Sequence, residues 1–536
     1  MIAVGYREIL SLVFLCAHCV STLRWLHMFQ LNSYKVGVQL RWLAQNKRYW
    51  LQDNGIALCV FPFSFLVSFL VSFLAPDGAS LASWAFILLF AGQCWRNRPC
   101  RMKMKKPLVY TNRIKRMLAT YTILVLGTVF LAFRAGSLEI QATELAVAHL
   151  LAPGFILLAN GINAPLEKAI NHRYVEDVRR KLREHPGLMV LGVTGSYGKT
   201  STKSFLHQLL SSKYDVLTTP ENFNTTLGVV RTLRERLKPY HELFVCEMGA
   251  RNVGDIREIC DLARPTHGVI TSIGPQHLES FKTLENIVKT KFELVDSLPK
   301  DGAAFLNLND ERVRAEASRL DESGCKTVTY GFSDSCDYQA RDMKVSVEGS
   351  SFSVKLPDST EMRIETSLIG VHNITNVLAA IAVADFMGVD RRDIIVGASR
   401  LKGVPHRLQL ICRGGDIVID DAYNSNAAGA KAALDVLALF EGYKILVTPG
   451  MVELGPRQNE LNENFGAQAA EICDFVILVG QRQTKSVYNG LLHAHYPESR
   501  IFVAANLGEG LSRLSAVDAG ARQKVILLEN DLPDNY

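Results

Sequence analysis

The sequence predicts an α-helical membrane bundle of about five spans, followed by two α/β domains that are each built on a doubly wound sheet. Its 536 residues, of which 48% are hydrophobic and 21% charged, exclude a disordered chain. The charge is divided unevenly, because residues 1–165 carry 16 Lys and Arg against 5 Asp and Glu, whereas the remainder carries 43 against 48. Long apolar runs lie in the first part, and from Leu188 onward short apolar runs alternate with stretches of helical spacing.

Residues 1–165 are predicted to form the transmembrane region. The loops at 32–52 and 96–116 are rich in Lys and Arg, so both are expected on the cytoplasmic side. This topology predicts a multi-pass protein of the cell membrane with its α/β domains in the cytoplasm. A cleaved signal peptide is the alternative for the first span, although Arg24 and His27 lie inside that span. The predicted spans are residues 10–29, 55–75, 80–95, 118–133 and 142–160.

A basic connector at residues 166–187 is expected to lead into the first α/β domain, residues 188–403, which is followed by the second, residues 404–536. Continuous apolar runs are typical of strands that are buried on both faces in a parallel sheet. Residues 345–356 instead alternate between apolar and polar side chains, which predicts a small antiparallel insert. A hinge is expected near residues 402–406. The predicted parallel strands are residues 189–193, 243–246, 268–272, 304–307 and 327–330, then 417–419, 444–447, 475–479, 501–503 and 525–528.

A phosphate-binding loop is the strongest local motif. Residues 192–201 read Gly-Val-Thr-Gly-Ser-Tyr-Gly-Lys-Thr-Ser, follow an apolar strand and open a helical run. Glycines let backbone N–H groups close on phosphate oxygens, Lys199 reaches the outer phosphates, and the Thr200 hydroxyl is placed for Mg²⁺. The spacing is the short form T-G-x-x-G-K-T-[ST]. The predicted cofactor-binding residues of the loop are Thr194, Gly195, Ser196, Tyr197, Gly198, Lys199, Thr200 and Ser201.

Two further polar side chains follow predicted strands. Glu247 ends one strand, at the sheet edge where open α/β sheets hold their ligands, and a carboxylate there suits a Mg²⁺ that bridges ATP phosphates. His277 follows the strand at 268–272. A solvent-exposed acid and a half-buried structural histidine are the alternative interpretations.

Many short fragments occur together and in a consistent order. They are residues 221–224, 247–250, 264–266, 274–279, 291–293, 372–376, 407, 420–426 and 450–455. In this combination the chain resembles the Mur ligase family of ATP-dependent amide-forming enzymes over about residues 188–480, and within that family the branch that adds D-alanyl-D-alanine. The resemblance implies a central ATP-binding domain with a phosphate loop, a Rossmann-like C-terminal domain, and ATP and Mg²⁺ as cofactors.

The resemblance also implies roles for individual residues at the phosphates. Lys199 and Thr200 would grip phosphates and one metal ion, and Glu247 and His277 would bind metal. Lys291 matches the lysine that several members carbamylate into a further metal ligand, and Lys289 lies two residues away. The implied metal ligands are therefore Thr200, Glu247, His277 and Lys291.

Other residues match the parts of the family that bind the nucleotide. His372, Asn373 and Asn376 open a helical run on a face that the family uses for the nucleotide base, and a helix cap is the alternative interpretation. Arg407 and Asp421 would reach phosphate and ribose from the last domain. The implied catalytic residues are Lys199, His277, Lys291 and Arg407.

The expected function is amide-bond formation by an ATP-dependent acid–amino-acid ligase through an acyl phosphate. Its predicted partners are a cell-wall peptide precursor, nucleotide-linked or lipid-linked, an amino acid or dipeptide amine, and membrane lipid; no nucleic acid is expected. Two departures leave alternatives open: no uridine-diphosphate-binding domain precedes Leu188, and Glu529-Asn530-Asp531 stands where a Lys-Gly-Ser turn is usual. The alternatives are a ligase for another polymer or peptide, such as polyglutamate or a secondary metabolite, and a nucleotide-driven transporter or scaffold.

Overall fold

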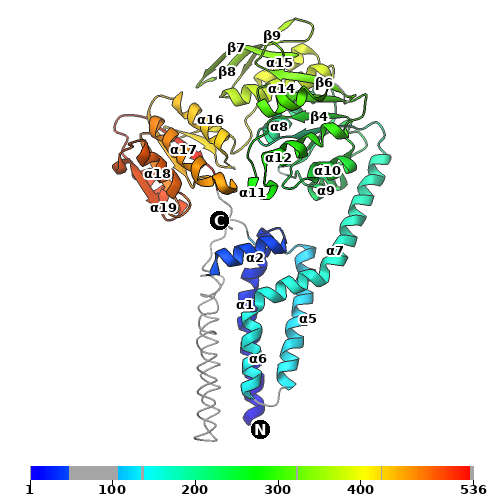
Figure 1. Ribbon diagram of the computed structural model, residues 1–536, viewed down its shortest axis with the longest axis vertical. Coiled ribbons are helices and arrows are strands. Elements are labelled where there is room, and N and C mark those ends of the chain that lie inside the picture. The colour runs from blue at the N-terminus through cyan, green and yellow to red at the C-terminus, as the bar shows by residue number, and fades with distance from the viewer. Residues whose placement is uncertain are drawn as a thin grey trace. The chain divides into compact units, whose positions relative to one another are not determined.

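The computed structural model describes residues 2–47, 107–134, 138–221, 223–320, 324–423 and 425–531 (Figure 1). The chain divides into two compact units, which meet in sequence between His172 and Arg173. The predicted spans at 55–75 and 80–95 lie outside the described residues, as do Asn222 and Asn424 of the sequence motifs.

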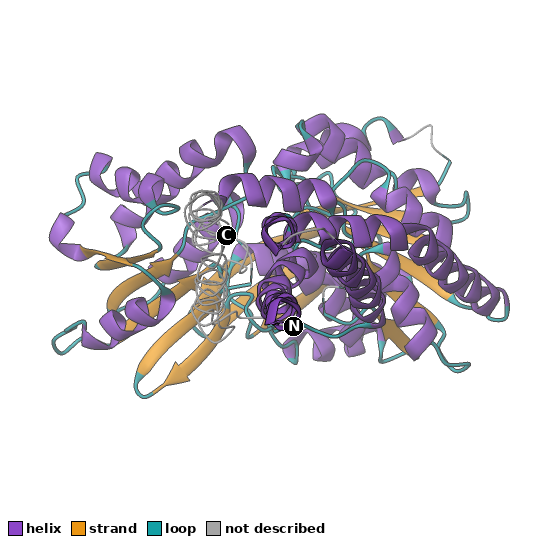
Figure 2. Cartoon of the chain, turned by 90° about the horizontal axis from the view of Figure 1, so that it is seen from below, coloured by secondary structure: helices purple, strands orange, loops and turns teal. Residues whose placement is uncertain are grey.

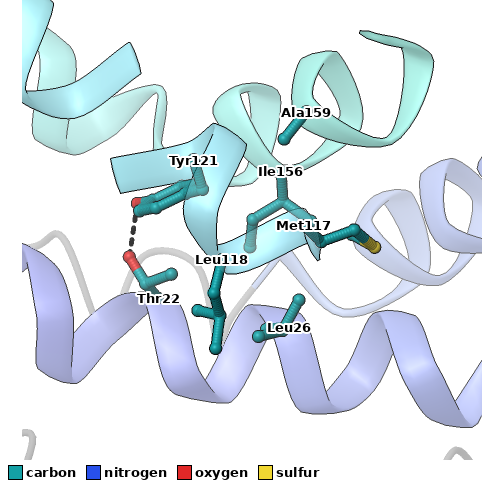
Figure 3. Close-up of a pocket in the computed structure, with 7 residues that line it drawn as sticks. All are labelled: Thr22, Leu26, Met117, Leu118, Tyr121, Ile156 and Ala159. Carbon is teal, nitrogen blue, oxygen red and sulfur yellow. Dashed lines mark hydrogen bonds between the residues drawn. The ribbon is translucent and has the colours of Figure 1, made fainter. Parts of the chain in front are cut away.

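The first unit is helical. Its helices α1, α5 and α6 lie side by side around a core that includes Phe14, Trp25 and Met117 (Figure 1). Polar groups also lie inside it: Tyr121 OH is 2.6 Å from His18 Nε2 and is hydrogen-bonded to Thr22, beside a small pocket (Figure 3). The helices of its described residues are α1 (Ile2–Leu31), α2 (Val36–Gln45), α5 (Asn112–Arg134), α6 (Leu138–Leu150) and α7 (Ala152–Arg183), the last of which continues into the second unit.

The prediction of a multi-pass membrane protein is wrong. Within the described residues a single helix, α5, is long and apolar enough to cross a membrane. The predicted span at 142–160 is broken, because α6 ends at Leu150 and α7 begins at Ala152, and 13 residues are too few for a spanning helix. The predicted span at 10–29 lies in α1, whose buried His18 and Thr22 take part in hydrogen bonds between and within helices.

The second unit begins with a nine-stranded sheet of order β2-β3-β1-β4-β5-β6-β7-β8-β9. Neighbours from β2 to β7 are parallel, and β7, β8 and β9 are antiparallel, as the alternation at 345–356 predicts. Its strands are β1 (Met189–Thr194), β2 (Val216–Thr218), β3 (Leu243–Glu247), β4 (His267–Ile270), β5 (Ala303–Asn307), β6 (Lys326–Gly331), β7 (Tyr338–Ser346), β8 (Gly349–Lys355) and β9 (Glu361–Thr366).

Successive side chains of a strand point to opposite faces of the sheet. Because both faces of this sheet are apolar, helices cover both. One core packs Leu191 and Val193 of β1 against helices α8 and α14, and the other packs Val190 and Phe244 against α9, α10 and α12. The helices are α8 (Lys199–Leu210), α9 (Thr226–Arg236), α10 (Asp255–Ala263), α11 (Leu278–Phe281), α12 (Leu284–Phe292), α13 (Glu311–Ala317), α14 (Val371–Phe386) and α15 (Arg391–Ser399), with a 3₁₀ turn, η3 (Val295–Ser297).

A second sheet has six strands in the order β10-β11-β15-β12-β13-β14, all parallel except for the β10–β11 pair. Helices pack on the strands of both sheets (Figure 2). Its elements are β10 (Gln409–Arg413), β11 (Asp416–Asp421), α16 (Ala427–Ala438), β12 (Tyr443–Thr448), η5 (Gly455–Arg457), α17 (Gln458–Ile472), β13 (Phe475–Val479), α18 (Lys485–His493), η6 (Glu498–Arg500), β14 (Ile501–Ala504), α19 (Leu507–Ala516) and β15 (Lys524–Glu529).

The ten strands that continuous apolar runs predict are all present. The sequence reading missed β2, which has three residues, β9, which lies beyond the predicted insert, and β10, a strand at the edge of the second sheet whose Ile411 is exposed. All three are edge strands, and an edge strand buries too few side chains to give a continuous apolar run. Helix starts follow local polar caps, for example the side chain of Asn426, which accepts a hydrogen bond from the N–H of Gly429.

Candidate active site

The phosphate loop joins β1 to α8, as its sequence predicts. Gly198 has a φ of 79°, a left-handed conformation that glycine adopts without strain. Gly195 also has a positive φ, and a Cβ added there would lie 2.0 Å from the Thr271 hydroxyl oxygen. The loop is fixed to the segment after β4, because the Ser196 N–H donates to the Ser272 carbonyl at 2.7 Å. The N–H groups in the first turn of α8 have no carbonyl partner within the helix, so they can donate hydrogen bonds to an anion.

Lys199 lies folded over its own loop. Its ammonium nitrogen donates to the carbonyl oxygens of Gly195 at 2.6 Å and Ser196 at 3.0 Å. Burial lowers the pKa of Lys199 to about 8, against the opposing pull of the Glu247 carboxylate. An incoming phosphate would restore full protonation, because an anion stabilises the ammonium form.

Tyr197 differs from the other residues of the loop. Its hydroxyl is buried without a hydrogen-bond partner, and its ring lies where a Cβ on Gly274 would stand, 2.5 Å away. Its backbone N–H donates to the hydroxyl of Ser272 at 3.1 Å. The side chain of Tyr197 therefore packs inside the protein and contributes to the loop's shape.

Glu247 ends β3 and is 1% exposed. Its Oε2 lies 3.0 Å from the ammonium nitrogen of Lys203, and its Oε1 accepts a hydrogen bond from Asn224 at 3.0 Å. Although burial alone would raise it, the ammonium groups of Lys203 and Lys199 hold the pKa of Glu247 below its usual range. The sequence reading missed Lys203, whose signal was its position four residues after Lys199 on one helix.

Lys291 and Lys289 differ in their exposure to solvent. Lys289 is exposed, whereas Lys291 on α12 is buried at 3% exposure. Burial and the charge of Lys199 place the pKa of Lys291 well below its usual range, even though Asp255 and Glu293 oppose the shift. The lowered pKa favours the neutral amine, which is the nucleophilic form of a lysine.

His277 contacts the second sheet's domain. Its Nδ1 lies 2.5 Å from Oε2 of Glu453, which follows β12. Burial lowers the pKa of His277, against the pull of Glu453. The neutral ring therefore donates Nδ1–H to the carboxylate and leaves Nε2 as the acceptor nitrogen. Sequence reading placed 450–455 among the motifs but gave Glu453 no role.

The three residues predicted for the nucleotide base lie at the start of α14. Asn376 lies at the phosphate loop, since its Oδ1 would be 2.5 Å from a Cβ on Gly198, and it accepts a hydrogen bond from Thr202. The Asn373 side chain instead donates to the carbonyl of Ile369 at 2.9 Å, whereas the N-cap of α14 is Gly370. Burial lowers the pKa of His372 to about 4, so its ring is neutral.

Acidic groups gather at the carboxyl ends of β11 and β15, where Asp421 is paired in register with Glu529. Burial raises the pKa of Asp421 to about 6, and burial together with Asp421 raises that of Glu529 well above its usual range. The Ser425 hydroxyl donates to Glu529 at 2.5 Å. Arg407 stacks at 4.2 Å over the Tyr423 ring, and its charge acts on both Asp421 and Lys199.

No three His, Cys, Asp or Glu side chains converge on a preformed metal centre in the described part of the chain. Of the predicted ligands Thr200, Glu247, His277 and Lys291, only Glu247 and His277 are of these four residue types. The Thr200 hydroxyl and the buried carboxylate of Glu247 nevertheless offer the hard oxygen donors that Mg²⁺ prefers, and this ion commonly takes its remaining ligands from substrate phosphates and water. The residues present fit Mg²⁺ that is bound together with ATP.

Comparisons with known proteins identify the family of both α/β domains. Sequence profiles of the Mur ligase middle domain and of the Mur ligase, glutamate ligase domain match residues 193–384 and 406–528. The UDP-N-acetylmuramoyl-tripeptide–D-alanyl-D-alanine ligase of Bacillus subtilis is 34% identical over 329 residues, 60% of this chain and 70% of that protein.

Two solved structures have the same fold over two thirds of this chain. MurF from Acinetobacter baumannii superposes with a TM-score of 0.61 at 26% identity, covering 67% of this chain and 77% of that one. MurF ligase from Thermotoga maritima in complex with ADP gives a TM-score of 0.59 at 27% identity, with 67% and 80% covered. The chain belongs to the Mur ligase family and is an ATP-dependent, Mg²⁺-using amide-forming ligase.

Proposed function

We propose that this chain joins the carboxylate of a cell-wall peptide precursor to the amine of D-alanyl-D-alanine or a similar dipeptide. The observation that carries the proposal is the grouping of Lys199, Glu247 and Lys291, whose charges act on one another at the carboxyl ends of β1 and β3. The choice of substrates is supported by the relatives, which are named for addition of D-alanyl-D-alanine to a UDP-linked muramoyl tripeptide.

The chemistry takes two steps. A donor carboxylate oxygen attacks the γ-phosphorus of ATP, the bond from that phosphorus to the bridging oxygen breaks, and ADP leaves. The acceptor amine then attacks the acyl carbon, loses a proton to water, and displaces inorganic phosphate as the amide forms. Lys199 and the N–H groups at the start of α8 stabilise the charge on the phosphoryl oxygens. Thr200, Glu247 and His277 would hold Mg²⁺, which would supply further neutralisation of the phosphate charge.

Lys291 has the properties that carbamylation requires. In its neutral form the amine nitrogen can add to the carbon of CO₂ and release a proton, which turns a buried amine into an anionic carbamate whose oxygens can bind a metal ion. The buried position explains why Lys291, and not the exposed Lys289, is the modified residue in this proposal.

The remaining site residues bind and position the nucleotide. Asn376 and His372 face the nucleotide from the start of α14, with Asn373 fixing that helix start. Arg407 and Asp421 bind phosphate and ribose from the second sheet's domain. The bidentate fork of Arg407 suits a phosphate, and stacking on Tyr423 holds its plane.

Product analysis tests the proposal. The purified full chain is supplied with ATP, Mg²⁺, a UDP-linked muramoyl tripeptide and D-alanyl-D-alanine, and ADP and the amide product are measured by mass spectrometry. Formation of the pentapeptide product is expected. A lipid-linked precursor in a parallel reaction decides which form of the donor is used.

A further inference from the structure

Glu453 is the acidic partner of His277 and comes from the other sheet. His277 precedes α11 in the central domain, while Glu453 lies between β12 and η5, and the two residues are 176 positions apart. The Nδ1 to Oε2 distance is 2.5 Å, and the side chains are 18% and 28% exposed. The two domains therefore meet at a short, partly buried hydrogen bond.

The backbone directs these two side chains toward each other. His277 has a φ of 53° and Glu453 a φ of 62°, both in the left-handed region that non-glycine residues rarely adopt. The neighbouring Gly455 of η5 approaches α11 closely, since a Cβ on it would lie 3.6 Å from the backbone nitrogen of Glu279. Two unfavourable backbone conformations persist on either side of one contact, which is expected where the surrounding packing determines them.

A hydrogen bond at one ring nitrogen of a histidine affects how the other nitrogen binds a cation. A histidine that binds a cation through Nε2 carries its proton on Nδ1, and a carboxylate that accepts this proton fixes the tautomer and the ring orientation and strengthens the ligand. Glu453 stands at Nδ1, on the side of the ring opposite to Nε2. It therefore acts on the cation site through His277 and does not touch the reacting atoms.

We propose that Glu453 is a positioning residue, which orients His277 as a cation ligand, so that the C-terminal domain completes the central domain's cation site. This inference rests on the proposed role of His277 and adds a residue to which neither the motifs nor the relatives' names give a function. It also assigns a use to the strained segment at 453–455.

The test measures cation binding by the full chain, with Mn²⁺ as the probe and a non-hydrolysable ATP analogue present. Electron spin-echo modulation from an imidazole nitrogen reports whether a histidine is bonded to Mn²⁺, and titration gives the affinity. Wild type is expected to show the nitrogen signal, and His277→Ala to lose it. Glu453→Ala should bind Mn²⁺ about 10-fold more weakly and show a reduced nitrogen signal, and Glu453→Gln should fall between.

Glu460→Ala is the matched control, because Glu460 is an exposed acid of the same region that pairs with Arg457. It should behave as wild type. Wild-type affinity and nitrogen signal in both Glu453 variants would overturn the inference. Absence of the nitrogen signal from wild type would overturn it as well, while amide formation, measured separately, decides the proposed function. Unchanged melting temperature of Glu453→Gln shows that a loss of signal is not a folding defect.

Discussion

The carboxyl ends of the two sheets hold ionisable side chains of opposite kinds, lysines at one and acids at the other. At the central sheet the ammonium groups of Lys199 and Lys203 act on the buried carboxylate of Glu247, and the buried Lys291 feels the charges of Lys199 and Glu247, whereas at the second sheet Asp420, Asp421 and Glu529 are buried together. Desolvation favours the neutral form in both places: it lowers the pKa of Lys199 and Lys291 and raises the pKa of Asp421 and Glu529.

The difference shows how the same architecture selects a ligand. Ligands of open α/β sheets lie at the carboxyl ends of the strands, so both edges are candidates by topology alone. The central edge has surplus positive charge that an anion would complete, while the second edge neutralises itself by holding protons and by the Ser425 hydrogen bond. Side-chain charge, and not the fold, makes the first edge the phosphate site.

The largest effect is expected from removing the cation that faces the phosphates. Lys199→Ala should lower kcat/KM for ADP release by about 10²- to 10³-fold, because its charge acts on the transferring phosphoryl group. The melting temperature should stay near that of wild type, since the hydrogen bonds of Lys199 in the described residues go to its own loop. Steady-state ADP release checks this. Lys289→Ala, an exposed lysine, is the control, and wild-type turnover in Lys199→Ala would remove the phosphate-loop assignment.

Glu247 is expected to serve both catalysis and stability, and a second substitution can separate the two roles. Glu247→Gln should abolish most activity and also destabilise the fold by about 3 kcal/mol, because it leaves the buried Lys203 ammonium without its partner. Part of the activity should return at high Mg²⁺, since a weakened site fills by mass action. The double variant Lys203→Met with Glu247→Gln should regain stability in denaturant unfolding and stay inactive. Recovery of both properties would show that Glu247 serves the fold alone.

Lys291→Ala tests the sign of the charge that this position supplies. Activity should fall by about 10²-fold and return in part when a short carboxylate fills the vacated space, because the role requires anionic oxygens. Intact mass of wild type in bicarbonate should include the mass of added CO₂. Plain lysine under turnover conditions, or rescue by a short amine instead, would contradict carbamylation.

The smallest effect concerns the acidic edge. An acid whose pKa is raised by folding binds its proton more tightly in the native state, so its stabilising contribution is present below the unfolded pKa and is lost as the pH rises through the folded pKa. Wild type should therefore lose stability as the pH rises from about 4 to 6, the raised pKa of Asp421, and should lose more as the pH passes the raised pKa of Glu529. Glu529→Gln should flatten this dependence and gain about 1 kcal/mol at pH 8. Denaturant unfolding across this range is the measurement, and Glu441→Gln, an exposed acid, should retain the wild-type slope.

Local spacing predicted the parts of the site that are contiguous in sequence. The loop from Thr194 to Ser201 and the strand that ends at Glu247 follow from glycines, a lysine and an apolar run in fixed order. Lys203, Glu453 and Glu529 could not be assigned in this way, because each acquires its meaning from a partner that folding brings from far along the chain. A single sequence does not show which distant charges meet.

The first unit shows the opposite failure. Apolar runs there were interpreted as membrane spans, but an apolar run is equally typical of a helix that is buried against other helices. The run at 142–160 contains the helix break at Leu151, which hydropathy averages away, and the buried hydrogen bonds of His18 and Tyr121 belong to a packed helical core. Chemistry-bearing motifs with fixed offsets were thus more informative than hydropathy.

The close approach of Tyr197 to Gly274 has a consequence for how the sequence can change over evolutionary time. The ring occupies the volume that any side chain at 274 would need. A mutation of Gly274 to alanine is therefore expected to clash with the ring while the tyrosine is present, and a smaller residue at position 197 would remove that clash. The effect of a substitution at position 274 therefore depends on the residue at position 197. Lineages that keep the tyrosine are expected to keep the glycine as well.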